Sequence, residues 1–443
     1  MPTSKKRKKR SKYRERKHGN PDFRHRANFP APDVKEIEQS LLKALSPAVF
    51  APLRMPQGAK KIRERILTLP VMVAVVVSLV WRNLPSLSEA LRILAREGML
   101  WVEPTEVSKQ ALSKRLDKLP ASLFEQVFSE AISSIRARDA NPEARVEKEY
   151  KQFSAVHIAD GSTMEALKKR IDSVKEKGTQ LGGKIMMVVE AMTRLPVKTF
   201  YTDDSKANDK RFCEQLLESL PVGGLLIFDL GFFSFPFFDA FTEAKKFFVT
   251  RLREKTSYEV VKVLSSGASY RDEIIKLGSY RSNPCHHQVR MVKVLWGKTW
   301  YQYLTNVLDP NSLSAPQVCE LYRRRWKIED AFLLTKRLLG LSYLWVSSNN
   351  GVEIQIYATW IFYAVLIDLS NEVALALKQP VERISVEMVF RSLYHFSRAR
   401  LRGESVEILS FIADNAKLFG IVKAIRNRHR VVDSINEQIW AHG

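Results

Sequence analysis

Two short apolar runs that each end in an aspartate constrain the fold of this chain most strongly. Residues 153–160 read Phe-Ser-Ala-Val-His-Ile-Ala-Asp, and residues 223–229 read Gly-Gly-Leu-Leu-Ile-Phe-Asp. Short apolar runs bounded by turn residues are typical of strands inside a sheet, and we expect the first to turn directly after its acid. The two runs therefore predict that Asp160 and Asp229 lie at the ends of neighbouring strands in a mixed sheet.

The hydrophobic pattern around these runs predicts the remaining elements of an α/β region. Further strands are expected at residues 184–192, 197–202 and 247–253, and helices at residues 208–220 and 232–245. The strands expected at residues 153–160, 184–192 and 197–202 should form an antiparallel meander. Because side chains alternate along a strand, Arg251 and Arg253 are expected on one face of the last strand.

Residues 33–145 precede this region and carry mostly helical patterns, which predicts a helical DNA-binding domain. The helix expected at residues 108–119 is short, basic and amphipathic, with Leu112, Leu116 and Leu119 at helical spacing. It is the candidate for entry into the major groove of DNA. An ordinary surface helix has the same pattern, and the sequence leaves both interpretations open.

The charge balance indicates a polyanionic partner. The chain has 71 Lys and Arg against 48 Asp and Glu, a formal net charge of +23. Nucleic acid ranks ahead of an anionic membrane surface as the partner of such a chain. Residues 1–32 hold much of the excess and are expected to form a disordered basic arm that contacts phosphates without reading sequence. A nuclear-import signal or a solvated tail would have the same composition.

The cysteine pattern indicates a reducing compartment. The three cysteines are far apart in the sequence and form no disulfide framework: Cys213, Cys285 and Cys319. The cluster at residues 285–287, Cys-His-His, lacks a further ligand at usable spacing, so we expect loop residues there rather than a zinc site. The most apolar run, residues 67–81, is shorter than the roughly 20 residues that span a bilayer and is expected to be a buried helix. The amino terminus lacks the apolar segment of a signal peptide, so export is not expected.

Residues 254–310 are expected to form a separate, smaller β element. Residues 287–296 and 299–307 alternate on either side of the turn Gly297–Lys298, which predicts a hairpin. Its aromatic side chains, including Trp296 and Trp300, are interpreted first as sheet packing and second as platforms for stacking bases.

One stretch places an acid among bases and aromatics at regular spacing. From Tyr322, the residues Arg325, Glu329 and Lys336 follow after three, seven and fourteen positions, and residues 320–336 are expected to form one helix. At about 100° per residue these four side chains fall within an arc of roughly 60° on one helix face. A solvated amphipathic helix also carries charges, so this pattern alone does not decide the function. A strongly apolar helix at residues 352–369 follows and is expected to cover the sheet.

Three acids can together hold divalent metal ions. Magnesium takes oxygen ligands and needs only a few carboxylates from rigid elements. A pair of such ions activates an attacking oxygen and stabilises the leaving oxygen at a phosphodiester. If the helix with Glu329 packs over the strand ends, Asp160, Asp229 and Glu329 form a three-carboxylate site for phosphodiester chemistry.

The order of these elements resembles the ribonuclease-H-like fold of DDE transposases. Residues 158–162, 229–232 and 325–329 resemble the three acid-bearing motifs of that family. The spacing of Tyr322, Arg325, Glu329 and Lys336 is similar to the Tyr-Arg-Glu-Lys signature of transposases of the insertion-sequence-four type. Lys184 with Asn208–Asp209 matches the family more weakly. The resemblance covers about residues 65–370.

The resemblance implies a domain organisation and a site. It implies an α/β fold with a ribonuclease-H-like mixed sheet at residues 146–253 and 311–375 and a β-rich insertion at 254–310. Residues 376–443 lie beyond the resemblance and are expected from their own pattern to form a basic helical region that could serve dimerisation. Two Mg²⁺ or Mn²⁺ ions would be held by Asp160, Asp229 and Glu329. The side chains expected to contact DNA are Tyr322, Arg325, Lys336, Arg251, Arg253, Trp296 and Trp300. One of the two tryptophans would hold a flipped base, whereas Trp326 is expected to be a packing residue.

The implied activity is cut-and-paste transposition of double-stranded DNA. The DNA partners would be the inverted repeats of an insertion sequence and a target site, bound by a homodimer in the synaptic complex. The resemblance further implies a prokaryotic cytoplasmic protein associated with the nucleoid and without a membrane partner. The sequence leaves two alternatives open, an inactive or domesticated DNA-binding relative and a metal-dependent nuclease on the same fold.

Overall fold

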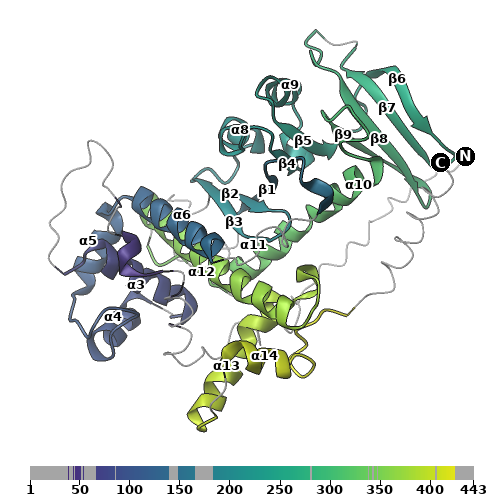
Figure 1. Cartoon of the computed structure of the whole chain (residues 1–443). Coiled ribbons are helices and arrows are strands. Elements are labelled where there is room, and N and C mark those ends of the chain that lie inside the picture. The colour runs from purple at the N-terminus through teal and green to yellow at the C-terminus, as the bar shows by residue number, and fades with distance from the viewer. Residues whose placement is uncertain are drawn as a thin grey trace, which may run out of the picture.

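The computed structural model describes residues 38, 43, 45–50, 53, 66–84, 86–138, 148–164, 183–279, 282–337, 339–341, 344–346, 348–404 and 407–424. The basic arm expected at residues 1–32 and the tail after residue 424 lie outside the described residues. The chain forms a mixed α/β structure in which a nine-stranded sheet is flanked by helices (Figure 1). The predicted α/β class is therefore confirmed.

The first five strands form one half of the sheet. They are β1 (Val156–Thr163), β2 (Lys184–Glu190), β3 (Pro196–Thr202), β4 (Leu225–Phe228) and β5 (Phe247–Arg251), in the spatial order β3-β2-β1-β4-β5. β1 pairs antiparallel with β2 and parallel with β4, and β4 pairs parallel with β5. β2 and β3 form the expected antiparallel pair. Both faces of β2 and β4 are buried, which explains why these strands are continuously apolar.

The first acid lies inside its strand rather than at its end. β1 continues past Asp160 to Thr163, because Asp160–Thr163 remain paired with Lys184–Met187 of β2. The expected turn at Gly161–Ser162 was therefore wrong. The parallel pairing of β1 with β4 does stop there, since its last pair joins Ala159 to Phe228.

The predicted β element at residues 254–310 is present but is not separate. It consists of β6 (Tyr258–Ser266), β7 (Tyr270–Leu277), β8 (Val289–Trp296) and β9 (Thr299–Thr305). β8 and β9 form the expected hairpin around Gly297. β9 also pairs antiparallel with β5, so the sheet continues in the order β5-β9-β8-β7-β6. The sequence predicted the strands β8 and β9 and the β character of the segment, but neither the strands β6 and β7 nor this pairing, which satisfies the backbone groups on the second edge of β5.

Helices cover both faces of the sheet. One face packs against η5 (Asp209–Phe212), α8 (Cys213–Ser219), η6 (Leu230–Phe232) and α9 (Phe235–Glu243). This layer is rich in phenylalanine; Phe238 stacks on Phe248 of β5 with ring centroids 4.8 Å apart. The other face contacts α10 (Ala315–Arg324) and α11 (Lys327–Arg337). The two acid-bearing strands are thus held between two helical layers.

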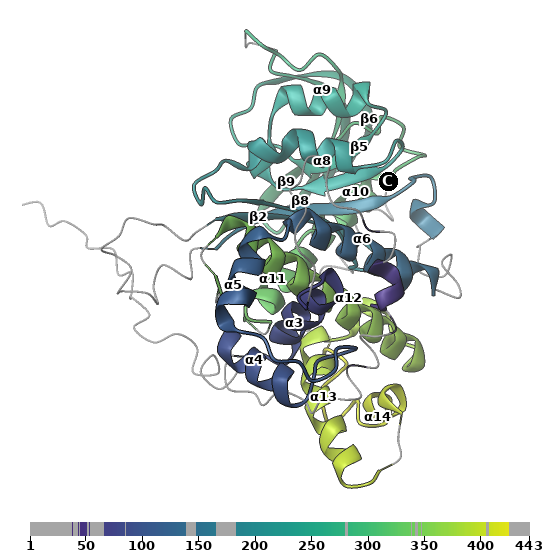
Figure 2. The same ribbon diagram turned by 90° about the vertical axis from the view of Figure 1, so that its left-hand side faces the viewer.

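The remaining helices belong to neither of these two layers. They are η1 (Pro47–Phe50), α3 (Leu69–Trp81), α4 (Leu87–Arg96), α5 (Lys109–Lys118), α6 (Ala121–Ala137), η2 (Lys148–Tyr150), α12 (Asn349–Ala376), η7 (Val381–Arg383), α13 (Val386–Leu401) and α14 (Ile408–Asp414). Figures 1 and 2 both place α3, α4 and α5 on the side of α6 and α12 that faces away from the sheet.

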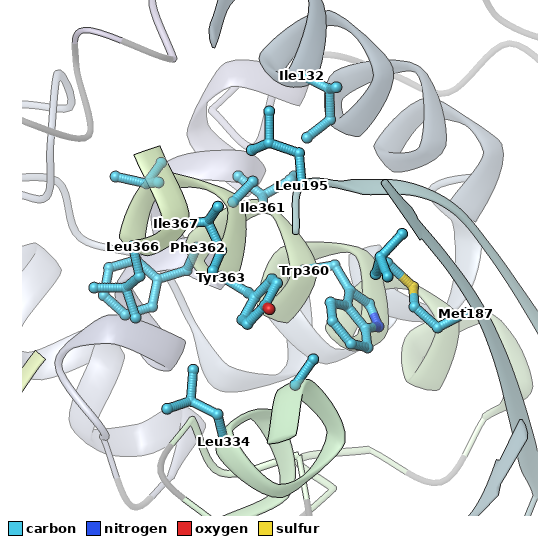
Figure 3. Close-up of a cluster of buried hydrophobic side chains, with 14 of the residues drawn as sticks. Ile132, Met187, Leu195, Leu334, Trp360, Ile361, Phe362, Tyr363, Leu366 and Ile367 are labelled. Carbon is cyan, nitrogen blue, oxygen red and sulfur yellow. The ribbon is translucent and has the colours of Figure 1, made fainter. Parts of the chain in front are cut away.

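The long helix α12 joins these parts. Figure 3 shows its side chains Trp360 and Tyr363 among Ile132 of α6, Met187 of β2 and Leu334 of α11. Within the sheet its strongest contact is with the edge strand β3, and Trp360 reaches Met187 of β2, so α12 covers the β3–β2 side of the sheet. α12 is long and apolar enough to cross a membrane by length and composition, yet 94% of its apolar window is buried inside the protein. Such burial is typical of a core helix.

Candidate functional site

The register of β1 and β4 brings two of the predicted acids side by side. Asp160 and Asp229 are the residues that directly follow the last β1–β4 pair. Each carboxylate accepts a hydrogen bond from the backbone N–H of the next residue, Gly161 at 2.8 Å for Asp160 and Leu230 for Asp229. These bonds fix the orientation of both carboxylates at the same edge of the sheet.

The predicted helix at residues 320–336 is interrupted. α10 ends at Arg324 and α11 begins at Lys327, with Arg325 and Trp326 in a turn between them. The backbone bonds here join residues three apart, because the N–H of Arg325 donates to Tyr322 O and that of Ile328 to Arg325 O, each at 3.1 Å. This tighter winding breaks the spacing of 3.6 residues per turn. The expectation of one straight helical face was therefore wrong.

The interruption places Arg325 at the centre of the three acids. Its Nη1 lies 2.8 Å from Asp160 Oδ2 and 4.0 Å from Asp229 Oδ2, and its Nη2 lies 3.4 Å from Glu329 Oε1. The Arg325 side chain is 6% exposed, whereas Asp229 and Glu329 are 43% and 48% exposed. The guanidinium is thus a buried counter-ion shared by three carboxylates that face solvent to different degrees.

Asp160 is the most buried of the three acids, and its pKa is raised from 3.8 to about 6. Burial is the main cause. The Arg325 guanidinium and the Gly161 N–H oppose the rise, and the carboxylates of Asp229 and Glu329 add to it. The ionised form of Asp160 is therefore disfavoured in the folded protein until a further cation approaches.

This shift predicts a pH-dependent stability difference between the wild type and Asp160→Asn. Between the unfolded pKa of 3.8 and the folded pKa of about 6, the native state binds more protons, so the Asp160 contribution to stability falls as the pH rises. The free energy of unfolding of Asp160→Asn, measured by urea titration, should therefore increase relative to wild type across this window and level off above it. A constant difference across the window would contradict the shift, and Asp368→Asn serves as a control.

Tyr322 and Lys336 flank the carboxylates but already have protein contacts. Tyr322 is buried, and its ring lies 5.3 Å from that of Tyr303 on β9. The Lys336 ammonium donates to Ser162 Oγ and, at 2.8 Å, to Thr163 O at the end of β1. Burial lowers the pKa of Lys336. Both residues thus attach the helices α10 and α11 to the sheet at the site.

Trp326 does not pack in the interior as the sequence predicted. Its side chain is 58% exposed, and the Arg325 guanidinium lies 4.8 Å from its ring centroid. The cause is the interruption between α10 and α11, which turns Trp326 outward. An exposed aromatic beside the three carboxylates is a feature that the sequence reasoning missed.

Arg251 and Arg253 diverge, contrary to the expectation of a shared face. β5 ends at Arg251, whose guanidinium lies 5.6 Å from the Tyr301 ring. Arg253 follows the strand and lies 5.2 Å from the Phe233 ring, with Nη2 3.3 Å from Leu230 O. Alternation along a strand no longer applies beyond its end.

The two tryptophans of the hairpin also point to different faces. Trp296 pairs with Thr299, and Trp300 pairs with Leu295, so the two rings lie on opposite sides of the sheet. Trp296 contacts Tyr301 with ring centroids 6.0 Å apart. The register places Trp296, Tyr301, Tyr303 and Arg251 on the same face as Asp160, whereas Trp300 lies on the other face and is 40% exposed.

The chemistry of the three acids fits a divalent metal, but their present arrangement does not group them as ligands. Carboxylate oxygens are the donors that Mg²⁺ and Mn²⁺ prefer. Among the residues that the structure describes, no set of three His, Cys, Asp or Glu side chains lies close enough to hold a metal ion. The Arg325 guanidinium lies between the carboxylates instead. A divalent ion bound by these carboxylates would therefore have to share them with the Arg325 guanidinium.

The Cys-His-His cluster has a contact that the sequence did not predict. Asp239 of α9 accepts hydrogen bonds from the backbone N–H groups of His286 and His287, at 3.0 Å and 2.9 Å, and from the Cys285 thiol. This carboxylate fixes the loop before β8 to the helical layer. Burial and the neighbouring Asp239 carboxylate raise the pKa of the Cys285 thiol to about 12.

Comparison with known proteins shows a similarity between the region that holds this site and one protein family. Residues 151–365 match the family model described as "Transposase DDE domain". This region contains all three carboxylates and Arg325. The match supports a DDE transposase, an enzyme class that acts on DNA by phosphoryl transfer.

Two curated relatives agree with the family match. The chain is 27% identical over 214 residues to "Putative transposase y4zB" of Sinorhizobium fredii (strain NBRC 101917 / NGR234), which covers 46% of this chain and 58% of the relative. It is 23% identical over 261 residues to "Probable transposase for insertion sequence element IS5377" of Geobacillus stearothermophilus, covering 58% of this chain and 65% of the relative. The chain thus spans about three fifths of the length of these relatives.

Among solved structures, the chain is similar to one titled "Cryo-EM structure of piggyBac transposase synaptic complex with hairpin DNA (SNHP)". The TM-score is 0.38 with 11% sequence identity, over 89% of this chain and 84% of the other.

Proposed function

We propose that this protein is a DNA transposase that cleaves strands at the ends of an insertion sequence and transfers them to a target. The observation that carries the proposal is the convergence of Asp160, Asp229 and Glu329 around Arg325, inside the region that matches the transposase domain. The strand order β3-β2-β1-β4-β5, with only β2 antiparallel to its neighbours, supports a ribonuclease-H-like catalytic sheet.

In this proposal the three carboxylates are the metal ligands. Asp160, Asp229 and Glu329 would hold two Mg²⁺ or Mn²⁺ ions, which supply Lewis-acid activation of the attacking oxygen and stabilise the leaving oxygen. The protein supplies rigid support, because Asp160 lies within a paired strand and Asp229 directly follows one. Glu329 lies in the first turn of α11, which faces the end of β1.

Arg325 is proposed to exchange a carboxylate contact for a DNA phosphate. Its guanidinium has five N–H donors in a fork that suits phosphate oxygens, and its Nε has no hydrogen-bond partner among the described residues. Lys336 and Tyr322 of the Tyr-Arg-Glu-Lys spacing would keep the same strand of DNA against the site. The exposed Trp326, with Trp296 and Arg251 on the carboxylate-bearing face, extends this surface along the sheet.

The net charge of the chain and the exposed lysines of α5 support DNA as the partner. The net charge of +23 favours double-stranded DNA. α5 presents the exposed lysines Lys109, Lys114 and Lys118, although Arg115 is buried, so a smaller basic face is offered to the major groove than the sequence indicated. We further propose that the protein binds the terminal repeats and the target DNA, with residues 33–145 as the DNA-binding domain and residues 254–310 as the insertion domain. In the synaptic complex it would act as a homodimer. In the cell it would be a cytoplasmic protein associated with the nucleoid.

A cleavage assay on the DNA that flanks the gene tests the proposal. Purified full-length protein with Mg²⁺ is expected to cut labelled duplexes carrying the flanking inverted repeats at the repeat ends, and to leave scrambled duplexes intact. Joined products with a short target duplication should appear when target DNA is added. Equal cutting of both duplexes would indicate the nuclease alternative, and binding without Mg²⁺-dependent cutting would indicate a domesticated DNA-binding protein.

A further inference from the structure

An ion pair lies between the two catalytic strand ends and is not part of the carboxylate site. Lys184, the first residue of β2, contacts Asp209 Oδ1 through its ammonium group, which also donates to Ala207 O at 3.1 Å. The side chains are 12% and 26% exposed. Asn208 caps the following turn by accepting from the Lys210 N–H at 3.1 Å. The carboxylate of Asp209 is therefore held by the Lys184 ammonium, while the Asn208 cap fixes the backbone of the turn that carries it.

The same carboxylate touches the glycines that follow the two catalytic aspartates. A Cβ placed on Gly161 would lie 2.7 Å from Asp209 Oδ1 and 3.2 Å from the Lys184 Cε. A Cβ placed on Gly231 would collide with Asp209 Oδ2 and lie 3.2 Å from its Cγ. One carboxylate thus fills the side-chain position of both glycines.

The glycines are required there for space and not for backbone conformation. Neither Gly161 nor Gly231 has a positive φ, so an alanine could adopt either backbone without strain. At Gly231 the Asp209 side chain excludes a larger residue, and at Gly161 the ion pair does so together with the Met186 Cε, 3.0 Å from the added Cβ. The packing of the Asp209 side chain also agrees with the contact of η5, which carries Asp209, against η6, which carries Gly231.

We propose that Lys184 and Asp209 form a positioning pair that sets the separation of Asp160 and Asp229. Gly161 directly follows Asp160, and Gly231 lies two residues after Asp229. Because the Asp209 carboxylate packs against both glycines and is paired with Lys184, a shift of either aspartate-bearing segment would displace the other. The inference rests on the proposed function, in which these two aspartates bind metal ions.

Two substitutions of opposite charge distinguish a role in positioning the two aspartates from a direct electrostatic effect on the bound cation. Asp209→Asn removes a negative charge near the site, and Lys184→Met removes a positive one. Through space, the first would weaken and the second would strengthen the binding of a cation. A positioning pair predicts that both substitutions weaken it by about 10–100-fold, as for other residues that orient metal ligands.

The test is calorimetric titration of Mn²⁺ into the full-length protein without DNA. Asp368→Asn is the matched control, because Asp368 forms another half-buried ion pair, 2.7 Å from Arg138, between α6 and α12. It should bind Mn²⁺ as the wild type does. Lys184→Arg keeps the charge and should recover most of the affinity lost in Lys184→Met. If either neutral variant fails to fold, the Mn²⁺ affinity of Lys184→Arg is compared with that of the wild type instead.

A second experiment tests the steric contact. Gly231→Ala should lower the Mn²⁺ affinity in the wild-type background but have little further effect in Asp209→Ala, because the collision partner is gone. Such non-additivity is the mark of a direct contact. Additive effects would overturn the proposed role of Asp209 at Gly231.

The outcomes distinguish the inference from the function on which it rests. If the wild type and Asp229→Asn bind Mn²⁺ equally, the proposed metal site fails. If Asp229→Asn loses binding while Asp209→Asn and Lys184→Met retain it, only the positioning pair is refuted. Opposite changes in affinity for the two neutral variants would also refute it, in favour of a field effect.

Discussion

Replacing Asp229 by asparagine is expected to abolish Mg²⁺-dependent strand cleavage while leaving DNA binding intact. Asparagine keeps the shape of the side chain and removes the charge that a divalent ion requires, and Asp229 is 43% exposed, so folding should tolerate the change. We expect the cleavage rate to fall by roughly 10³-fold or more. Single-turnover cleavage of a labelled terminal-repeat duplex measures the rate, and a gel-shift assay measures binding.

Glu259→Gln is the matched control for this experiment. Glu259 is an exposed acid on β6, at the far edge of the same sheet, and its neutralisation changes the net charge by the same amount. The control should cleave at the wild-type rate. If Asp229→Asn cleaved as fast as the control, Asp229 would not be a metal ligand, and a loss of DNA binding equal to the loss of cleavage would point to a misfolded site.

Replacing Arg325 by glutamine is expected to change two measurements in opposite directions. In the DNA-free protein the Arg325 guanidinium competes with a divalent ion for Asp160, 2.8 Å away, and for the other two carboxylates. Removing a unit charge about 4 Å from the site is worth several kcal/mol before screening by solvent, so we expect Mn²⁺ to bind about tenfold more tightly. Cleavage should nevertheless slow down, because the proposed contact between Arg325 and a DNA phosphate is lost.

Arg323→Gln separates this local effect from a loss of positive charge in general. Arg323 lies two residues away and pairs with Glu320, at 2.8 Å from its Nε, rather than with the three acids. Its replacement should leave the Mn²⁺ affinity unchanged. Weaker Mn²⁺ binding by Arg325→Gln would mean that the guanidinium supports the ligands instead of competing for them.

These expectations combine what the sequence predicted with what the structure corrected. The apolar runs before Asp160 and Asp229 predicted strands, and the register of β1 and β4 places the acids side by side. The spacing of Arg325 and Glu329 predicted their proximity correctly even though the assumed continuous helix was wrong, because the interruption between α10 and α11 keeps them 3.4 Å apart. The local sequence pattern was sufficient to predict a contact between residues that are only a few positions apart in the chain.

Other features could not be read from local pattern. The exposure of Trp326 depends on the turn at 325–326, and the divergence of Arg251 and Arg253 depends on where β5 ends. The pairing of β9 with β5 joins residues more than fifty positions apart, and no periodicity specifies such a partner. A glycine directly after Asp160, and another soon after Asp229, was the signal that could have indicated close packing there.

The sequence by itself determined most of the strands and helices around the site, the three acids and the basic character of the chain. These follow from hydrophobic period, residue type and charge, which are local or summed properties. Only the tertiary structure decided that Arg325 lies among all three carboxylates and that Asp209 fits against Gly161 and Gly231. The physical reason is that these contacts are set by strand register, by a break in a helix and by close packing between segments distant in the sequence.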